Sequence, residues 1–168
     1  MKTLIESAAA AKAASTVVAQ LTTEQKNAAL LAMADALESG MADILEANRA
    51  DMERERANGM SESMLDRLMP NEARVRDMAA GLRQVAELPD PIGEVMADWK
   101  RPNGLEIRKV RVPMGVIGII YEARPNVTVD AASLAFKAGS AILLRGSGSA
   151  YESNAAEVRV MRAALESV

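Results

Sequence analysis

Apolar residues in roughly the first ninety positions recur at the spacing of one helix face. Residues 4–21 are rich in alanine, the residue with the highest helix propensity. Thr22 and Gln25 fit a capping box at the start of a second helix, and Gly40 stands where that helix would end. The pattern predicts five helical segments, over residues 4–21, 22–40, 41–57, 61–68 and 71–87. We interpret their apolar stripes as core packing.

Residues 88–91 interrupt the helical pattern, because two nearby prolines cannot continue a helix. Beyond them, residues 94–100 and 105–112 are strand candidates around Arg-Pro-Asn-Gly at 101–104, a hairpin turn signal. Charged side chains occur on both faces of this predicted hairpin. We therefore expect residues 92–112 to lie outside the core, either as a free edge or against another subunit in an oligomer.

The segment from 112 to 147 has the most informative pattern in the chain. The pattern predicts a strand at Gly115–Ile120, a polar elbow at Tyr121–Asn126, a helix at Val127–Ala138 and a second strand at Ser140–Leu144. Both strands are continuous apolar runs and are expected to be buried, so the segment indicates one βαβ unit of a parallel sheet. A last amphipathic helix is expected over residues 151–168.

The sequence thus predicts the α/β class, with a helical layer at residues 1–88, the hairpin at 92–112 and a βαβα core at 113–168. The core would be part of a doubly wound, Rossmann-like parallel sheet. Two strands make a thin sheet, since parallel strands usually have several neighbours and cover on both faces. We therefore expect these residues to be the N-terminal part of something longer. Ligands of such sheets bind beyond the carboxyl ends of the strands, which makes the two strand exits the candidate site.

Composition narrows the chemistry that the chain can perform. The 168 residues contain no cysteine and no histidine, which excludes disulfides, zinc sites made of Cys and His, and nucleophiles activated by histidine. A net charge of −3 disfavours a nucleic-acid partner or a polybasic membrane contact. No apolar run approaches the roughly 20 residues of a membrane span, and no signal peptide is evident, so a cytoplasmic location is expected.

The first strand exit carries Glu122, Arg124 and Asn126 around a stiffening proline. In a functional interpretation, the Asn126 amide donates to a developing oxyanion and Arg124 clamps an anionic group of the substrate. In a purely structural interpretation, Asn126 caps the helix that begins at Val127. The composition of the turn does not separate the two.

The second exit, Arg145-Gly146-Ser147-Gly148-Ser149, is short and rich in hydrogen-bond donors, but it matches neither glycine-rich nucleotide fingerprint. An arginine at a strand end suits a phosphate bound through two hydrogen bonds. The structural alternative is a surface loop in which Ser147 or Ser149 caps the next helix. Other charged residues are expected on solvated faces or in local ion pairs, and Trp99 and Phe136 are expected to pack; the charged set comprises Asp90, Asp130, Lys137 and the runs 53–56 and 72–76.

Two runs, Arg111–Leu134 and Ala141–Gly146, closely resemble the gamma-glutamyl phosphate reductase family, which belongs to the aldehyde dehydrogenase superfamily. The likeness extends to residues 56–68 and 83–95 and so covers essentially the whole chain. The segment Tyr-Glu-Ala-Arg-Pro-Asn-Val at 121–127 is the part of the likeness that is specific to this family within the superfamily. The resemblance implies NADPH-dependent reduction of gamma-glutamyl phosphate to glutamate 5-semialdehyde in proline biosynthesis, with release of phosphate.

The resemblance also implies roles for individual residues. Asn126 would face the oxygen of a thioester formed on a catalytic cysteine, while Arg124 and Glu122 would bind substrate. Arg145, Gly146 and Ser147 would contact the adenosine ribose of the cofactor. The loop at 146–149 has no acidic residue, and this fits NADP, because a carboxylate would repel the 2′-phosphate.

Family members are much longer than this chain, and their cysteine lies beyond position 168. The resemblance therefore implies an N-terminal part of the cofactor-binding domain, without the catalytic domain and inactive alone. It further implies a homo-oligomer and allows an association with glutamate 5-kinase. Two alternatives stay open: another acyl reductase of the aldehyde dehydrogenase type, and a non-enzymatic, mainly helical module that binds a nucleotide or dimerises.

Overall fold

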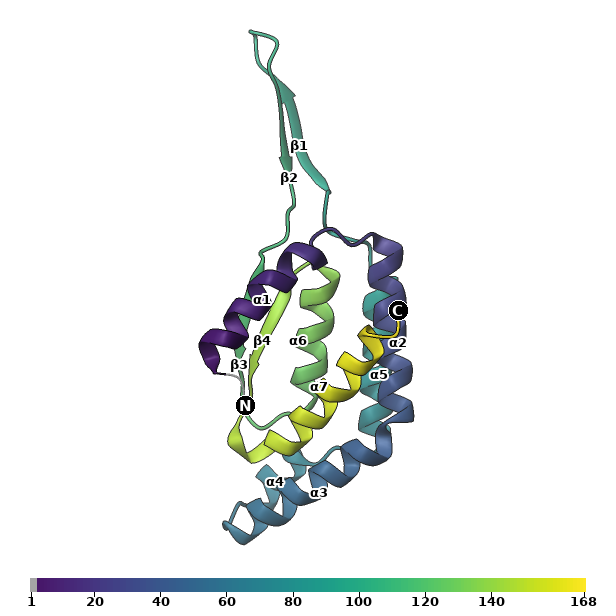
Figure 1. Cartoon of the computed structure of the whole chain (residues 1–168), viewed down its shortest axis with the longest axis vertical. Helices are drawn as coiled ribbons and strands as arrows, with labels where there is room; N and C mark the ends of the chain where they lie inside the picture. The colour runs from purple at the N-terminus through teal and green to yellow at the C-terminus, as the bar shows by residue number, and fades with distance from the viewer. Residues whose placement is uncertain (1–2) are drawn as a thin grey trace.

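Residues 3–168, which the computed structural model describes, form a mainly helical α/β fold with two small sheets (Figure 1). The α-helices are α1 (Leu4–Val18), α2 (Thr23–Ser39), α3 (Met41–Ala57), α4 (Glu62–Leu68), α5 (Glu72–Glu87), α6 (Asn126–Lys137) and α7 (Tyr151–Leu165). The strands are β1 (Val95–Lys100), β2 (Glu106–Val110), β3 (Val116–Ile120) and β4 (Ala141–Arg145), and a short 3-10 helix, η1, spans Gly148–Ala150. None of the helices in this described range is long and apolar enough to cross a membrane.

The core lies where α2 packs against α5 and α7. The expected stripe on α2 is buried, as is most of the stripe on α5. The predicted capping box of α2 is present, since the Thr22 hydroxyl accepts from the Gln25 N–H and the Gln25 amide oxygen accepts from the Thr22 N–H. Gly40 ends α2 where the pattern predicted. A Cβ at this position would lie 3.0 Å from a methyl group of Val160, so the small residue allows α7 to approach closely.

Strands β3 and β4 pair in parallel, with Val116 opposite Ala141 and Ile120 opposite Arg145. Helix α6 connects them, and both α6 and α1 pack against β4. The βαβ unit predicted from the sequence is therefore present. The strands are not fully buried as expected, because only two strands form this sheet within residues 3–168; Ile120 is 87% exposed.

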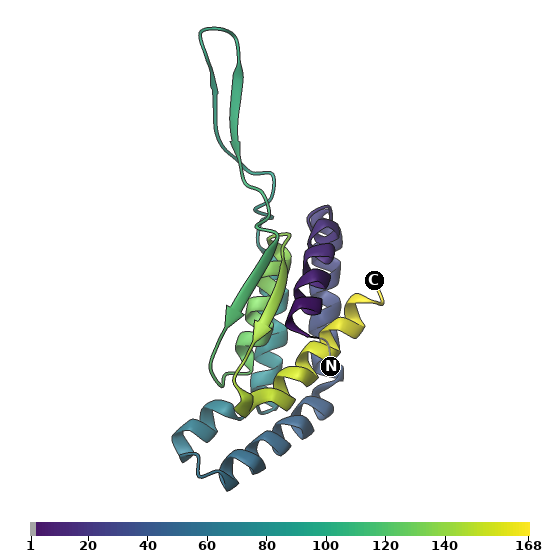
Figure 2. The ribbon, with the colours of Figure 1, turned by 60° about the vertical axis from the view of Figure 1, so that its left-hand side comes forward.

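The hairpin formed by β1 and β2 projects away from the helices, as both views show (Figures 1 and 2). Gly104 in its turn has φ +89°, a conformation that suits glycine. Every residue of β1 is exposed, including Trp99 at 45%, so Trp99 does not pack within residues 3–168 as the sequence predicted. Cross-strand ion pairs line the arm; one joins Arg108 Nε to Asp98 Oδ2 at 3.0 Å.

A buried charge cluster at the base of the hairpin corrects a second expectation. Lys137 is only 3% exposed, and its Nζ donates to Asn27 Oδ1 at 2.6 Å and to the Ala86 carbonyl at 2.9 Å. Asp90 forms an ion pair with Lys26, which is 2% exposed. Neither Lys137 nor Asp90 is therefore on a solvated face. Their contacts join α2, α5 and α6 to the segment that leads into β1.

Candidate functional site

The two strand exits lie next to each other at one edge of the parallel pair. The Tyr121 N–H donates to the Arg145 carbonyl at 3.1 Å, just beyond the last paired residues of β3 and β4. This arrangement follows from the parallel register, since the carboxyl ends of both strands meet at the same edge. The two exits that the sequence predicts as the candidate site are therefore neighbours in the structure.

At the first exit, Arg124 and Asn126 line a hollow of about 510 Å³ between the start of α6 and the α4–α5 region. The charged residues of its wall are balanced in sign: Arg67, Arg74, Arg124, Asp66, Asp77 and Asp130. Glu122 is exposed and is not among the residues that line the hollow. The structure thus brings together two of the three residues proposed for this exit.

Asn126 does not cap α6, so that alternative is wrong. The helix begins at Asn126 itself, Pro125 occupies the cap position, and no side-chain cap hydrogen bond is formed. The Asn126 amide instead donates from Nδ2 to Asp130 Oδ2 at 3.2 Å, one turn along the helix. An amide nitrogen has two N–H groups, so one of them stays free for another acceptor.

At the second exit, Arg145 is exposed and donates to the neighbouring Gly146 carbonyl. It forms no ion pair within residues 3–168. Ser147 caps η1, because its hydroxyl accepts from the Ser149 N–H at 3.3 Å. Ser147 therefore caps only η1. The alternative that Ser147 or Ser149 caps the helix at 151–168 is wrong, because Ala150 stands at the cap position of α7 and provides no side-chain hydrogen bond there. The exposed Arg145 guanidinium stays available to an anion.

Gly146 is required by close packing between the two exits. A Cβ at this position would lie 2.3 Å from Asn154 Nδ2 and 3.1 Å from the Tyr121 ring. The Tyr121 hydroxyl in turn lies 2.7 Å from the Thr128 hydroxyl, which donates to Asn154 Oδ1 at 3.1 Å. A polar chain thus connects the elbow after β3 with α6 and α7, directly beneath the second exit.

Glu157 on α7 lies next to this polar chain. It was not predicted from the sequence, because α7 is amphipathic and glutamate is common on solvated faces. The side chain is fully buried, and neither carboxyl oxygen has a hydrogen-bond partner among residues 3–168. Burial raises the pKa of Glu157 well above its ordinary value. The nearby Thr128 hydroxyl offsets only part of this rise, since its hydrogen is directed to Asn154.

Replacing this acid by its neutral amide, Glu157→Gln, is expected to stabilise the chain at pH 8 by about 1–3 kcal/mol. Because burial raises the folded-state pKa, the folded chain releases this proton at a higher pH than the unfolded chain, whose carboxyl group has the ordinary value of 4.5. The wild-type chain therefore loses stability as pH rises from 4.5 towards the folded-state pKa, and E157Q does not. Urea unfolding at several pH values measures this difference. An unchanged difference between pH 5 and pH 8 would contradict the assignment.

The chain is similar in sequence to gamma-glutamyl phosphate reductases of several bacteria. The gamma-glutamyl phosphate reductase of Moorella thermoacetica is 58% identical over 151 residues, which cover 90% of this chain and 36% of the relative. That of Anoxybacillus flavithermus is 54% identical over 166 residues, which cover 99% and 40%. The chain thus spans about 40% of the length of the curated relatives it matches. No protein-family model matches the chain.

Comparison with solved structures finds the same similarity. The crystal structure of gamma-glutamyl phosphate reductase from Thermotoga maritima superposes with a TM-score of 0.97 at 46% identity, over 99% of this chain and 40% of that one. An acetylating aldehyde dehydrogenase from Geobacillus thermoglucosidasius superposes with a TM-score of 0.58 at 19% identity, over 94% and 32%. The second likeness concerns the fold alone.

Proposed function

Because the chain is a homologue of the gamma-glutamyl phosphate reductases and spans about 40% of their length, we propose that it forms the N-terminal part of the cofactor-binding domain of such an enzyme. In this proposal, residues 1–88, of which 1 and 2 lie outside the described residues, are a helical layer, 92–112 an oligomerisation hairpin and 113–168 part of a doubly wound sheet of the aldehyde dehydrogenase fold. The observation that carries the proposal is the superposition with the Thermotoga maritima enzyme over nearly the whole chain.

The activity we propose for the complete enzyme is reduction of gamma-glutamyl phosphate to glutamate 5-semialdehyde, with release of phosphate. NADPH, when bound, supplies the hydride. The 168 residues contain no cysteine, so they do not supply the nucleophile that the family resemblance implies. Their part is to bind and orient cofactor and substrate at the two strand exits.

Arg145 with the loop at 146–149 is the proposed contact to the cofactor ribose and its 2′-phosphate. Two features of the structure fit this role. The Arg145 guanidinium is exposed and forms no ion pair within the described range 3–168, and Gly146-Ser147-Gly148-Ser149 carries no acid that would repel a phosphate. Arginine binds phosphate through two parallel hydrogen bonds, which fixes orientation as well as charge.

Arg124 and Asn126 are the proposed substrate contacts at the first exit. Both line the 510 Å³ hollow, and Arg124 forms no ion pair within residues 3–168. Its guanidinium suits an anionic group of the substrate, and the free N–H of the Asn126 amide suits an oxyanion. Glu122 stands outside the hollow, so a contact from Glu122 would have to be made from the rim.

A chimeric enzyme tests the proposal. In this chimera, residues 1–168 replace the equivalent segment of the Moorella thermoacetica reductase. We expect phosphate-dependent oxidation of glutamate 5-semialdehyde with NADP, the reverse of the proposed reaction, followed at the absorbance of NADPH. The 168-residue chain alone is the inactive control, because it lacks a cysteine. A chimera that is folded by circular dichroism and gel filtration but inactive would contradict the proposal.

The exposed hairpin is the proposed contact between subunits. Its apolar side chains would otherwise face water: Val95, Met96, Trp99, Leu105 and Val110 are each at least 40% exposed. Apolar side chains exposed together on a projecting arm mark a protein contact. Tryptophan is among the residues that contribute most to such interfaces.

Replacing the hairpin tryptophan, Trp99→Ser, is expected to weaken self-association by roughly tenfold or more. Sedimentation equilibrium of the 168-residue chain measures the dissociation constant. The matched control is Leu88→Ser, because Leu88 is 50% exposed but lies before the hairpin. Association that is equally weakened by both changes, or a wild-type chain that is monomeric throughout, would count against the hairpin as the interface.

A further inference from the structure

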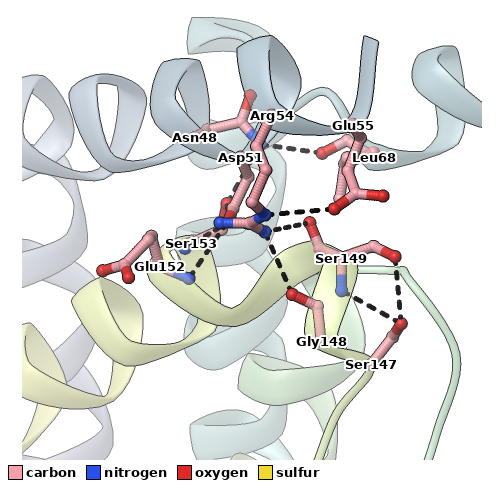
Figure 3. Close-up of polar contacts among 10 residues, drawn as sticks. All are labelled: Asn48, Asp51, Arg54, Glu55, Leu68, Ser147, Gly148, Ser149, Glu152 and Ser153. Atoms are coloured by element: carbon pink, nitrogen blue, oxygen red, sulfur yellow. Dashed lines mark hydrogen bonds and ion pairs between the residues drawn. The ribbon is translucent and has the colours of Figure 1, made fainter. Parts of the chain in front are cut away.

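Asp51 of α3 caps a helix that begins a hundred residues later in the chain (Figure 3). Its carboxylate accepts from the Ser153 N–H at 2.8 Å, from the Ser153 hydroxyl at 2.7 Å and from the Glu152 N–H at 3.3 Å. These amides belong to the first turn of α7, where backbone N–H groups have no partner within the helix. Ala150, at the cap position of α7, provides no side-chain hydrogen bond, so Asp51 takes over that function.

The capping carboxylate is completely buried; Arg54 contacts it directly, and Asn48 holds its partner Ser153. Arg54 Nη2 donates to Asp51 Oδ1 at 2.7 Å, which pairs the buried charge. Asn48 Nδ2 donates to Ser153 Oγ at 3.0 Å and to the Leu68 carbonyl at 2.9 Å. A buried carboxylate with this many donors is fixed in one orientation, because each change of rotamer would leave an unpaired charge.

Arg54 also reaches the loop of the second strand exit. Its Nη2 donates to the Gly148 carbonyl at 3.0 Å and to the Ser149 carbonyl at 3.2 Å, so one guanidinium joins Asp51 to both loop carbonyls (Figure 3). Within the loop, the side chains of Ser147 and Ser149 form hydrogen bonds with no other side chain of residues 3–168 than each other. The loop is therefore attached to the helical layer through its backbone, and its serine side chains are not used for that attachment.

We propose that Asp51 and Arg54 are positioning residues for the cofactor loop at 146–149, an inference that rests on the proposed function of this loop. Because Asp51 occupies the N-terminal amides of α7, an anionic cofactor group is not bound by that helix end. It is bound by Arg145 and by the serine hydroxyls of the loop. Asp51 and Arg54 of α3, which we call the clamp, hold this loop in place. The specificity for a 2′-phosphate then depends on two residues of α3 that do not contact it.

Hydrogen exchange of the 168-residue chain tests the clamp itself. Asp51→Ala is expected to speed exchange of the Ser153 amide at least about tenfold, while the Met161 amide, further along α7, is unchanged. Should Asp51→Ala not fold, Arg54→Met provides the same test, with faster exchange at Ala150, whose N–H donates to the Ser147 carbonyl. The matched control is Arg49→Met, an exposed arginine of the same helix. Unchanged exchange in both Asp51 and Arg54 variants would overturn the clamp.

Steady-state kinetics of the chimera test the positioning role. Arg54→Met is expected to raise the KM for NADPH five- to twentyfold relative to the unsubstituted chimera. The KM for NADH, and the kcat with either cofactor, are expected to stay within about twofold of the unsubstituted chimera. Arg54→Lys keeps the charge but cannot reach Asp51 and the loop together, so an intermediate KM is expected. Equal losses with NADPH and NADH would show a purely structural role and overturn the inference. A wild-type chimera without NADP activity would refute the proposed function, whereas the exchange experiment would still report on the clamp.

Discussion

Replacing Arg145 by glutamate in the chimera is expected to raise the KM for NADPH far more than the KM for NADH. Losing one charge-assisted hydrogen bond to a phosphate costs roughly 1.5–3 kcal/mol, which corresponds to about 10- to 150-fold in binding. The new carboxylate would also repel the 2′-phosphate, which NADH does not carry. The loop itself has no acid, so this repulsion is absent from the wild-type chain.

The matched control is Arg159→Glu, the same change of charge at an exposed position of α7 away from the loop. This control is expected to leave both Michaelis constants within about twofold. Equal losses for NADPH and NADH in Arg145→Glu would show that Arg145 does not contact the ribose phosphate. The loop at 146–149 would then be a surface connection, and the positioning role of α3 would lose its purpose.

The sequence was sufficient to predict the two strands and their neighbouring exits, because the signals for these features are local. Apolar runs at 115–120 and 140–144 indicated the strands, and the helical pattern between them required a parallel connection. Once the strands are parallel, their polar exits have to be neighbours, as the hydrogen bond from Tyr121 to Arg145 confirms. Capping by Thr22 was equally predictable, since its partner lies three residues away.

The sequence was not sufficient for contacts between distant segments. Asp51 and Ser153 are 102 residues apart, and the spacing of α3 alone gives no reason to expect a cap there. Glu157 stands in an amphipathic helix, where burial of a carboxyl group depends on how α6 packs over it. The half-exposed β3 has a similar origin, since a run of apolar residues reports the preference of a strand and not which neighbours cover it.

The buried charge cluster at the base of the hairpin is a further set of contacts between distant segments that the sequence did not predict. We expect its loss to have the largest effect on stability. Its members come from three elements and the turn before β1, and both lysines are at least 97% buried. Burial raises the pKa of Asp90, but hydrogen bonds from Lys26, the Ile92 N–H and Thr23 outweigh burial and hold the pKa below its ordinary value. One carboxylate thus compensates the charge of Lys26 and attracts Lys137, whose pKa burial lowers.

Removing this carboxylate, Asp90→Ala, is expected to lower the free energy of unfolding at pH 7 by roughly 2–4 kcal/mol. Breaking a buried ion pair leaves an uncompensated charge, and the cost is slightly below the range for fully buried pairs because Asp90 retains 13% exposure. Urea unfolding followed by circular dichroism measures the loss. Adding Lys26→Met to Asp90→Ala is expected to restore part of it, because the unpaired ammonium group is then gone.

Asp35→Ala is the matched control, since Asp35 also pairs with a cation, Arg83, at 2.7 Å but is 74% exposed. Its loss is expected to stay below about 1 kcal/mol, as for other exposed pairs. The effect of pH distinguishes Asp90→Ala from Asp35→Ala further. A carboxylate with a lowered pKa stabilises the fold above the ordinary value of 3.8 and loses this contribution as pH falls through the folded-state pKa. The gap between wild-type chain and D90A should therefore narrow below pH 4. A gap that is small at pH 7, or that does not narrow in acid, would show that Asp90 is not what holds the two buried lysines.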